Sequence, residues 1–208
     1  MNFPDFKNKI EDLKIKKLGG LEAQFKMAPK LRLKYDADKI QASNPKKASV
    51  LALFYPNNKN ETCLLLTQRA SYKGTHSAQI SFPGGKAEKG DKNSEYTALR
   101  ETYEEVGIET SKVAIFREIT DVYIPPSNFL ATPFLGFTDS KPTFVLNHEV
   151  AKTIEILVSD LLDDKVLSTV NLTTSYMKNI DVPCFKINDY IIWGATGMML
   201  SEIKELLK

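Results

Sequence analysis

The 208-residue chain has little of several features, and each shortage excludes a class of protein. It holds only two cysteines, Cys63 and Cys184, which excludes a disulfide framework of the kind found in small secreted proteins. Both lie in apolar, strand-like stretches and are expected to be buried thiols, although the sequence alone leaves a disulfide between them open. No apolar run reaches the length of a membrane span, and the charged N-terminal residues do not form a secretory signal. We therefore expect a cytoplasmic protein without a membrane partner.

Net charge is also small, at +2 over the whole chain. No basic stripe with interleaved aromatic residues is present, so the sequence does not favour nucleic-acid binding. Internal repeats and low-complexity tracts are absent as well. A hydrophobic content of 42% is sufficient for one substantial core. These features indicate a compact protein with a single core.

The chain is expected to form one domain preceded by a short helical arm. Phe6, Ile10 and Leu13 follow helical spacing before a glycine pair, which places the arm at 1–20 and the domain at 21–208. A turn at 56–60 joins the first two expected strands. Strands are expected at 48–55, 62–68, 113–120, 129–137, 153–158 and 190–193, and an amphipathic helix at 195–207. Mixed strands and helices predict an α/β fold whose sheet is covered on both faces.

The most informative segment is 100–107, which reads Arg-Glu-Thr-Tyr-Glu-Glu-Val-Gly. Glu101, Glu104 and Glu105 are spaced so that a helix would carry all three carboxylates on one face. Like charges repel there unless a cation lies among them, and carboxylate oxygens suit Mg²⁺ or Mn²⁺. An ordinary solvated acidic face is the alternative. The segment therefore indicates a metal site in which Arg100 reaches Glu104 one turn away and holds its side chain.

The ends and the inner side of this helix can also be predicted. Asn93 or Ser94 would cap its start, and Gly107 would end it in the left-handed conformation. On a helical wheel, four residues fall opposite the glutamates and would face the core. These residues are Leu99, Thr102, Tyr103 and Val106.

A glycine-containing turn precedes the helix at 82–86. Phe82 and a proline lead into Gly84 and Gly85, whose lack of a side chain lets the backbone approach a ligand closely. Backbone groups of such a turn can bind a metal or a phosphate. The turn, the capped helix and the three carboxylates together are more specific than any one of them.

These residues resemble the Nudix box, a pattern written G-x5-E-x7-R-E-U-x-E-E-x-G-U, where U is aliphatic. The second half fits from Arg100 to Ile108 without a gap. In the first half, Asp91 takes the place of the glutamate and the next spacer is one residue longer. The coenzyme A pyrophosphatase branch of the family is similar in both respects.

A second motif of that branch lies upstream. Its members carry L-L-T-x-R-[SA]-x3-R-x3-G-x3-F-P-G-G, and this chain reads Leu-Leu-Thr-Gln-Arg-Ala up to residue 70, then Phe-Pro-Gly-Gly from Phe82 at the required distance. Gly74, beside Lys73, replaces the second arginine, and Ala78 replaces the motif's glycine. Similar segments elsewhere extend the resemblance from about residue 20 to the C-terminus.

The resemblance implies a Nudix-type α/β/α sandwich with a mixed sheet and the hydrolysis of a diphosphate linkage. Mg²⁺ or Mn²⁺ would be the cofactor, held by Glu101, Glu104 and Glu105. Arg100 would orient the carboxylates, and Gly85 would add a backbone ligand. The substrate would contact Arg69, Lys73, Phe82, Gly84 and Gly85. A homodimer is compatible with the resemblance.

The general base is open between two residues. Glu105 could bind the metal and activate water together, and Glu149 could act from a loop outside the helix. An ordinary surface glutamate is the alternative reading of Glu149, just as Arg69 could pair with a nearby carboxylate in a structural role. His76 and His148 give no comparable signal.

Three functions follow from these residues. The first is cleavage of coenzyme A or acyl-coenzyme A into 4′-phosphopantetheine and adenosine 3′,5′-bisphosphate. The second is a Nudix pyrophosphatase for ADP-ribose, a dinucleotide or a nucleoside triphosphate, which the changes at Gly74 and Ala78 favour. The third is a non-catalytic Nudix-like module that senses a nucleotide, against which the retained carboxylates argue.

Overall fold

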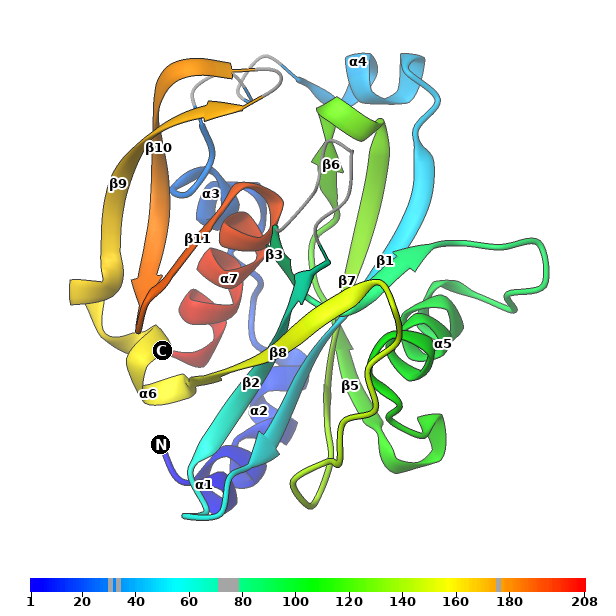
Figure 1. The fold of residues 1–208 in the computed structure, drawn as a ribbon, viewed down its shortest axis with the longest axis vertical. Helices are drawn as coiled ribbons and strands as arrows, with labels where there is room; N and C mark the ends of the chain where they lie inside the picture. Colours follow the sequence, from blue (N-terminus) through cyan, green and yellow to red (C-terminus); the bar gives the residue numbers. More distant parts are fainter. Residues whose placement is uncertain (30–31, 33–34, 71–78, 175–176) are drawn as a thin grey trace.

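The computed structural model describes residues 1–29, 32, 35–70, 79–174 and 177–208, which are arranged around one large sheet (Figure 1). Among these residues the sheet has eight strands; β1 and β7 run parallel, and the other pairs run antiparallel. The strands are β1 (Lys46–Pro56), β2 (Thr62–Arg69), β3 (Ile80–Ser81), β4 (Gly84–Lys86), β5 (Ala114–Glu118), β6 (Val122–Ile124), β7 (Phe129–Phe137) and β8 (Val150–Leu157). The predicted mixed sheet is confirmed.

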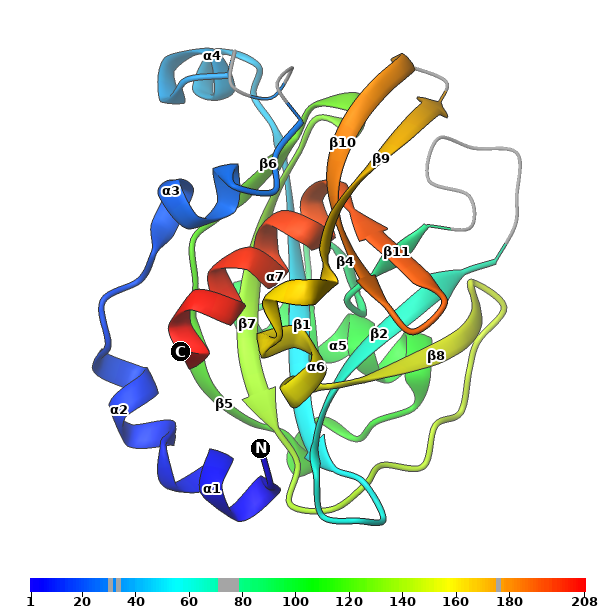
Figure 2. The same ribbon diagram turned by 90° about the vertical axis from the view of Figure 1, so that its left-hand side faces the viewer.

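Helices cover this sheet on both sides. They are α1 (Phe3–Asn8), α2 (Ile10–Ile15), α3 (Gly20–Phe25), α4 (Ala37–Ala42), α5 (Ser94–Val106), α6 (Val158–Leu162) and α7 (Gly194–Leu207), with short 3-10 turns η2 (Thr110–Lys112), η3 (Pro125–Ser127) and η4 (Asp164–Val166). α5 lies on one side of β1 and β7, and α7 lies on the other (Figures 1 and 2). The α/β/α sandwich that the sequence predicted is therefore confirmed.

The residues of β1 explain why both faces of the sheet are covered. Leu51, Leu53 and Tyr55 are buried in a core shared with α5, whereas Ala52 and Phe54 are buried in a second core shared with α7. Successive side chains of a strand point to opposite faces, so a strand buried on both sides reads as a continuous apolar run. The turn after β1 returns the chain to β2, as the sequence predicted.

The N-terminal helices α1 and α2 pack into the core on the α7 side. Phe6, Ile10 and Leu13 are buried there, and the ring centroids of Phe6 and Phe54 are 4.7 Å apart. The sequence predicted one helix with these residues facing inward, and the structure divides it at Lys9. The buried positions follow the predicted spacing, because the two helices continue almost without a gap.

A smaller antiparallel sheet, with three strands among the described residues, leads into α7. Its strands are β9 (Leu167–Thr174), β10 (Met177–Ile187) and β11 (Tyr190–Trp193), in the order β11-β10-β9. β11 and α7 were predicted, β9 was not, and of β10 only the stretch around Cys184 was described as strand-like. β9 alternates between exposed and half-buried residues and carries serine, threonine and asparagine, so its hydrophobic pattern is weak.

One edge of β1 pairs with two strands and thereby opens a wedge in the large sheet. Val50 of β1 pairs with Gly84 of β4, whereas Phe54 pairs with Leu64 of β2. β2 then diverges from β1 and pairs with β3 and β8 (Figure 1). The backbone of β4 and the backbone at the end of β2 therefore lie on the two sides of this wedge, above α5.

Two shortages noted in the sequence have structural counterparts. Cys63 and Cys184 are both buried and free, so the prediction of buried thiols is confirmed and the alternative disulfide is not formed. Burial raises the pKa of the Cys63 thiol to about 11. Within the ranges that the structure describes, no helix combines the length and the apolar character needed to cross a bilayer.

Replacing Phe6 with alanine should lower the free energy of unfolding by about 3–5 kcal/mol, because the ring is fully buried against Phe54. Ile15→Ala is the control from the same arm, since Ile15 is 84% exposed. That variant should remain within about 0.5 kcal/mol of the parent. Urea denaturation followed by circular dichroism measures both. Equal stability of the two variants would contradict a role of the arm in the core.

Candidate active site

Helix α5 begins and ends where its sequence predicted. The side chain of Asn93 accepts a hydrogen bond from the backbone N–H of Tyr96 at 2.7 Å and so caps the first turn. Gly107 ends the helix with φ at +75°, and its N–H donates to the carbonyl of Tyr103 at 2.8 Å. The left-handed conformation favours glycine at this position. These caps fix the position of the segment that carries the glutamates.

The predicted inner side of α5 is wrong at one position. Thr102 and Val106 are buried, as predicted, but Tyr103 is 53% exposed and Glu105 is only 5% exposed. The helix packs against both β1 and β4, and this contact turns it so that Glu105 instead of Tyr103 lies on the covered side. A helical wheel cannot give this rotation, because it depends on the neighbouring strands.

Glu105 is held at the turn of β4. The N–H of Gly84 donates to its Oε2 at 3.1 Å, and Nη1 of Arg69 lies 3.8 Å from its Oε1. Burial raises the pKa of the Glu105 carboxyl to about 7, and the charges of Glu101 and Glu149 act in the same direction. The single backbone donor and the distant guanidinium therefore compensate only part of the cost of burying this charge.

Glu101 lies one turn earlier, directly against Gly85. A Cβ atom at residue 85 would lie 2.4 Å from Oε2 of Glu101, which is closer than real contacts allow. Glycine is thus required for the carboxylate to approach the backbone of β4. Burial raises the pKa of Glu101 as well, and Arg100 opposes this shift from 3.1 Å.

The preceding residues hold the glycine turn against β1. Gly84 adopts φ of +148°, and a Cβ there would lie 2.4 Å from the carbonyl oxygen of Ser49. The carbonyl of Pro83 accepts a hydrogen bond from the N–H of Leu51 at 2.9 Å, and Phe82 is buried. The turn therefore presents backbone to α5 on one side while its apolar residue anchors it.

Arg100 and Asp91 form a nearly buried ion pair beside the glutamates, joined by two hydrogen bonds. Nε and Nη2 of Arg100 donate to the two Asp91 oxygens at 2.9 and 3.0 Å. Asp91 also accepts from the hydroxyl of Thr97 at 2.8 Å and from the N–H of Glu88 at 2.9 Å. The hydrogen bonds from Arg100 hold the pKa of Asp91 well below its usual range. Both oxygens of the Asp91 carboxylate thus accept hydrogen bonds.

The remaining nitrogens of Arg100 reach the glutamates and β4. Nη1 donates to Oε2 of Glu104 at 3.0 Å, as the sequence predicted, and lies 3.1 Å from Oε1 of Glu101. Nη2 also donates to the carbonyl of Lys86 at 3.1 Å. One guanidinium therefore links the segment before the helix, the helix itself and β4.

Glu149 faces α5 from across the wedge. Its Oε2 accepts from Nη2 of Arg69 at 3.0 Å, its N–H donates to the side chain of Asn147 at 2.9 Å, and its carbonyl accepts from the N–H of Ala70 at 2.7 Å. The structural pairing left open for Arg69 is thus present. The buried Nε of Arg69 has no hydrogen-bond partner.

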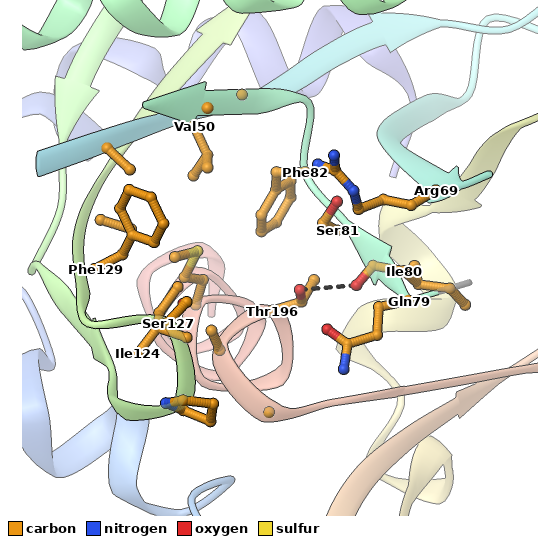
Figure 3. Close-up of a pocket in the computed structure, with 18 of the residues that line it drawn as sticks. Val50, Arg69, Gln79, Ile80, Ser81, Phe82, Ile124, Ser127, Phe129 and Thr196 are labelled. Carbon is orange, nitrogen blue, oxygen red and sulfur yellow. Dashed lines mark hydrogen bonds between the residues drawn. The ribbon is translucent and has the colours of Figure 1, made fainter. Parts of the chain in front are cut away.

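These groups line one end of a large cavity of about 1250 Å³ (Figure 3). Glu101 and Glu105 of α5 line it together with Glu149 and Arg69. The turn residues at the same end are Phe82, Gly84 and Gly85. The cavity thus brings buried carboxylates and exposed glycine backbone to one place.

Comparison with known families identifies this arrangement. The NUDIX domain family matches residues 45–164, which include the glycine turn and α5. The chain belongs to the Nudix family. The matched segment starts near β1 and ends within η4, so the Nudix domain contains the carboxylate end of the cavity.

Several curated Nudix hydrolases are similar to the chain over most of its length. Nudix hydrolase 3 of Caenorhabditis elegans is 30% identical over 162 residues, which cover 69% of this chain and 66% of that protein. Nudix hydrolase 22 of Arabidopsis thaliana, a chloroplastic protein, is 29% identical over 75% of this chain and 53% of its own length. The Nudix hydrolase NudL of Photorhabdus laumondii is 29% identical over 71% of this chain and 78% of its own. The chain thus spans about half to two thirds of the first two relatives.

A solved structure supports the fold. The MutT/nudix family protein from Enterococcus faecalis aligns with a TM-score of 0.52 and 13% identity, covering 86% of this chain and 75% of that protein. At this identity the likeness concerns the architecture alone. It agrees with the mixed sheet between α5 and α7.

The Nudix residues singled out in the sequence fall into three groups. Glu101, Glu105 and Glu149 reach the cavity together with the other predicted contact residues of the described chain. Glu104 does not line it; its side chain is half exposed and bonded to Arg100, which lies behind the carboxylates. Lys73, with Gly74, His76 and Ala78, lies outside the described residues. His148 is exposed and does not line the cavity.

The donor groups at this end fit a divalent cation. Within the described part of the chain, no three acidic, histidine or cysteine side chains converge as a preformed metal site. Glu101 and Glu105 nevertheless supply the hard oxygen donors that Mg²⁺ and Mn²⁺ prefer, and burial raises the pKa of both. The close contact at Gly85 leaves no room for a side chain between these oxygens and the β4 backbone.

Two contributions were missed in the sequence. Asp91 was noted only as a departure from the Nudix box, and its role as the anchor of Arg100 emerges from the hydrogen bonds. The position of Asp91 within the Nudix box was the signal in the sequence that could have indicated this role. The cavity residues of β11 and α7, such as Trp193 and Thr196, lie in a segment that the sequence showed only as similar to the branch, with no predicted role in a site.

Replacing Asp91 with asparagine should lower the free energy of unfolding by about 3 kcal/mol at pH 7, because the substitution removes the most deeply buried of the carboxylates that pair with the guanidinium of Arg100. Asp139→Asn is the matched control. Asp139 pairs with Lys7 at the surface, its side chain is 74% exposed, and its loss should cost less than about 1 kcal/mol. Denaturant titration measures both effects.

The difference between the parent and the Asp91 variant should also depend on pH. Because the folded-state pKa of Asp91 is lowered, the carboxylate stabilises the fold above the ordinary carboxyl pKa of about 4 and loses this contribution as the pH falls below it. Denaturation from pH 7 to pH 3 should therefore show the two stabilities converging. A constant difference over this range would contradict the assigned ion pair.

Proposed function

We propose that this chain is a metal-dependent Nudix pyrophosphohydrolase that cleaves a diphosphate linkage in a nucleotide derivative. The observation that supports it is the cavity at which Glu101 and Glu105 of the Nudix helix meet the backbone of Gly84 and Gly85. Burying two carboxylates is costly for a structural protein, and it is useful for a protein that binds cations. The curated relatives are named hydrolases, in agreement with this proposal.

Mg²⁺ or Mn²⁺ is the proposed cofactor, since Nudix hydrolases generally use such divalent ions. Glu101 and Glu105 would hold it together with Glu104, whose side chain would have to leave Arg100. When bound, the ion neutralises charge on the diphosphate and increases the acidity of a coordinated water. Gly85 is proposed to add a backbone oxygen.

The other residues are proposed to position the carboxylates and the substrate. Arg100, held by Asp91, would keep Glu101 in place for the metal, and it holds Glu104 until that side chain turns to the ion. Arg69 lines the cavity and would contact a phosphate while it holds Glu149. Phe82 and Gly84 would shape the same end.

Glu105 and Glu149 are the two candidates for the general base. Glu149 lines the cavity, and its carboxylate is linked to Glu105 through Arg69. It therefore has access to a water molecule near the diphosphate without belonging to α5. A base must lie within hydrogen-bond reach of the proton that it accepts, and both residues line the cavity in which the substrate is proposed to bind.

Coenzyme A or an acyl-coenzyme A is the proposed substrate, with 4′-phosphopantetheine and adenosine 3′,5′-bisphosphate as products. The upstream motif that ends at Phe82 supports this choice. A cavity of about 1250 Å³ is also larger than the roughly 300–1000 Å³ typical of small-molecule sites, which favours a long substrate. ADP-ribose, dinucleotides and nucleoside triphosphates are the alternatives. The division at residue 20, the homodimer and the cytoplasmic location stay predictions.

Glu101→Gln and Glu105→Gln should each lower kcat by at least about 100-fold with Mg²⁺ or Mn²⁺ present, because each removes a negatively charged oxygen donor. Glu109→Gln, an exposed residue just beyond the helix, is the control and should retain activity. Purified proteins are assayed on coenzyme A, ADP-ribose and diadenosine tetraphosphate, with chelator as the metal-free reference. Full activity of the Glu101 variant would contradict the metal role.

Glu104→Gln distinguishes two roles of its carboxylate. If Glu104 binds the metal, kcat should fall by orders of magnitude and rise with added Mn²⁺, while circular dichroism stays unchanged. If it serves only as the exposed partner of Arg100, kcat should change by less than about threefold. A nucleotide-sensing module would show no turnover in any variant, yet would retain nucleotide binding.

A hydrolase of coenzyme A should release adenosine 3′,5′-bisphosphate from it faster than it cleaves the other diphosphates at equal concentration. The motif ending at Phe82 motivates this expectation. Chromatographic separation of the products measures it. Rapid cleavage of ADP-ribose beside intact coenzyme A would reject the substrate and leave the reaction class standing.

A further inference from the structure

Away from the carboxylates, the cavity extends between the sheet and α7 as a largely apolar chamber, and Arg32 and Lys39 also line the cavity. We define the chamber by Val50, Ile124, Phe129, Trp193, Ala195 and Met199, all of which line the cavity. In Figure 3, Val50, Phe82, Ile124 and Phe129 point into the space in front of α7. Val50 is in β1, Ile124 ends β6 and Phe129 begins β7, so the sheet forms one wall and α7 forms the other.

The second wall comes from a part of the chain that the Nudix match does not include. The match ends at residue 164, whereas Trp193, Ala195 and Met199 belong to β11 and to the first turns of α7. The hydroxyl of Thr196 donates to the carbonyl of Ile80 at 2.9 Å and so fixes α7 to β3 (Figure 3). This wall is therefore fixed in place, and its chemistry belongs to this chain and not to the general Nudix motif.

The chamber is continuous with the carboxylate end, and its side chains are only partly covered. Val50, Ile124, Phe129, Trp193 and Ala195 are all half-buried, so apolar surface remains open to the cavity. Exposed apolar surface of this kind marks binding sites in soluble proteins. A ligand with charge at one end and an apolar group at the other would match the carboxylate end and the chamber.

We propose that the chamber binds an uncharged, apolar extension of the diphosphate substrate, and that Trp193, Ala195 and Met199 determine the length of the group that fits. The proposal rests on the hydrolase function only in assigning the charged end of the ligand to the carboxylates. Its occupant is a flexible aliphatic group such as the acyl chain of a thioester. Each methylene that enters the chamber leaves water and strengthens binding.

Trp193 provides a direct measurement, because it is the only tryptophan in the chain and lines the chamber. The protein is kept with chelator so that no hydrolysis occurs, and its tryptophan fluorescence is titrated with coenzyme A and with its acetyl, butyryl, hexanoyl and octanoyl thioesters. All five ligands share the same nucleotide, so differences report the acyl group. A buried methylene tightens binding by up to about fourfold, and the Kd should fall at least about tenfold from acetyl to octanoyl.

Matched substitutions locate the effect. Ala195→Leu adds volume to the α7 wall and should reduce the acetyl-to-octanoyl ratio of Kd values to less than about threefold. Ala114→Leu, the same change at an exposed position of β5 outside the cavity, should keep the parent ratio. Circular dichroism checks whether Ala195→Leu folds. If it does not, Ser127→Leu takes its place, because it adds volume from the opposite side of the cavity and should reduce the ratio in the same way.

The outcomes separate this inference from the proposed function. A Kd that is independent of chain length, or the same ratio in the Ala195, Ser127 and Ala114 variants, would overturn the chamber assignment even if coenzyme A is cleaved when metal is added. A chain-length dependence that the Ala195 or Ser127 variant removes would support it, even if metal yields no cleavage of any diphosphate and the hydrolase function fails.

Discussion

The site depends on the burial of two carboxylates against the two glycines of β4. Glu101 and Glu105 can approach β4 only because Gly84 and Gly85 present bare backbone there. Burial raises the pKa of both carboxyls, since one N–H and the neighbouring guanidinium groups compensate only part of the lost hydration. The fold therefore holds two carboxylates whose negative charge is only partly compensated, and packing elsewhere in the protein keeps them buried.

The guanidinium groups on either side divide the task of holding this charge. Arg100 is held by Asp91, which precedes the helix, and it contacts Glu101 without lining the cavity itself. Arg69 lies among them and joins Glu149 to the same group. An aspartate suffices at residue 91 because it lies just before the cap of α5, where its shorter side chain reaches both Arg100 and Thr97.

Local rules recovered much of this from the sequence. The caps of α5, the turn after β1, the buried positions of the N-terminal helices and the bond from Arg100 to Glu104 all depend on neighbours within a few residues. The rotation that buries Glu105 and exposes Tyr103 depends on β4, which is only three residues long. Strand β9 was missed because its polar residues weaken its pattern, although its partner β10 follows it directly in the chain. The wall at Trp193 meets cavity residues from distant parts of the sequence, so no periodicity reveals it.

Helix α7 serves two purposes along its length. Its first turns face the cavity, whereas later residues hold the fold: Glu202 accepts from Gln24 at 2.8 Å and from Thr120 at 2.7 Å, and Lys204 donates to the carbonyl of Leu161 at 2.6 Å. Substitutions at Ala195 can therefore accumulate without loosening the anchor of the N-terminal helices. Ligand preference and stability can therefore evolve separately, because they depend on different parts of α7.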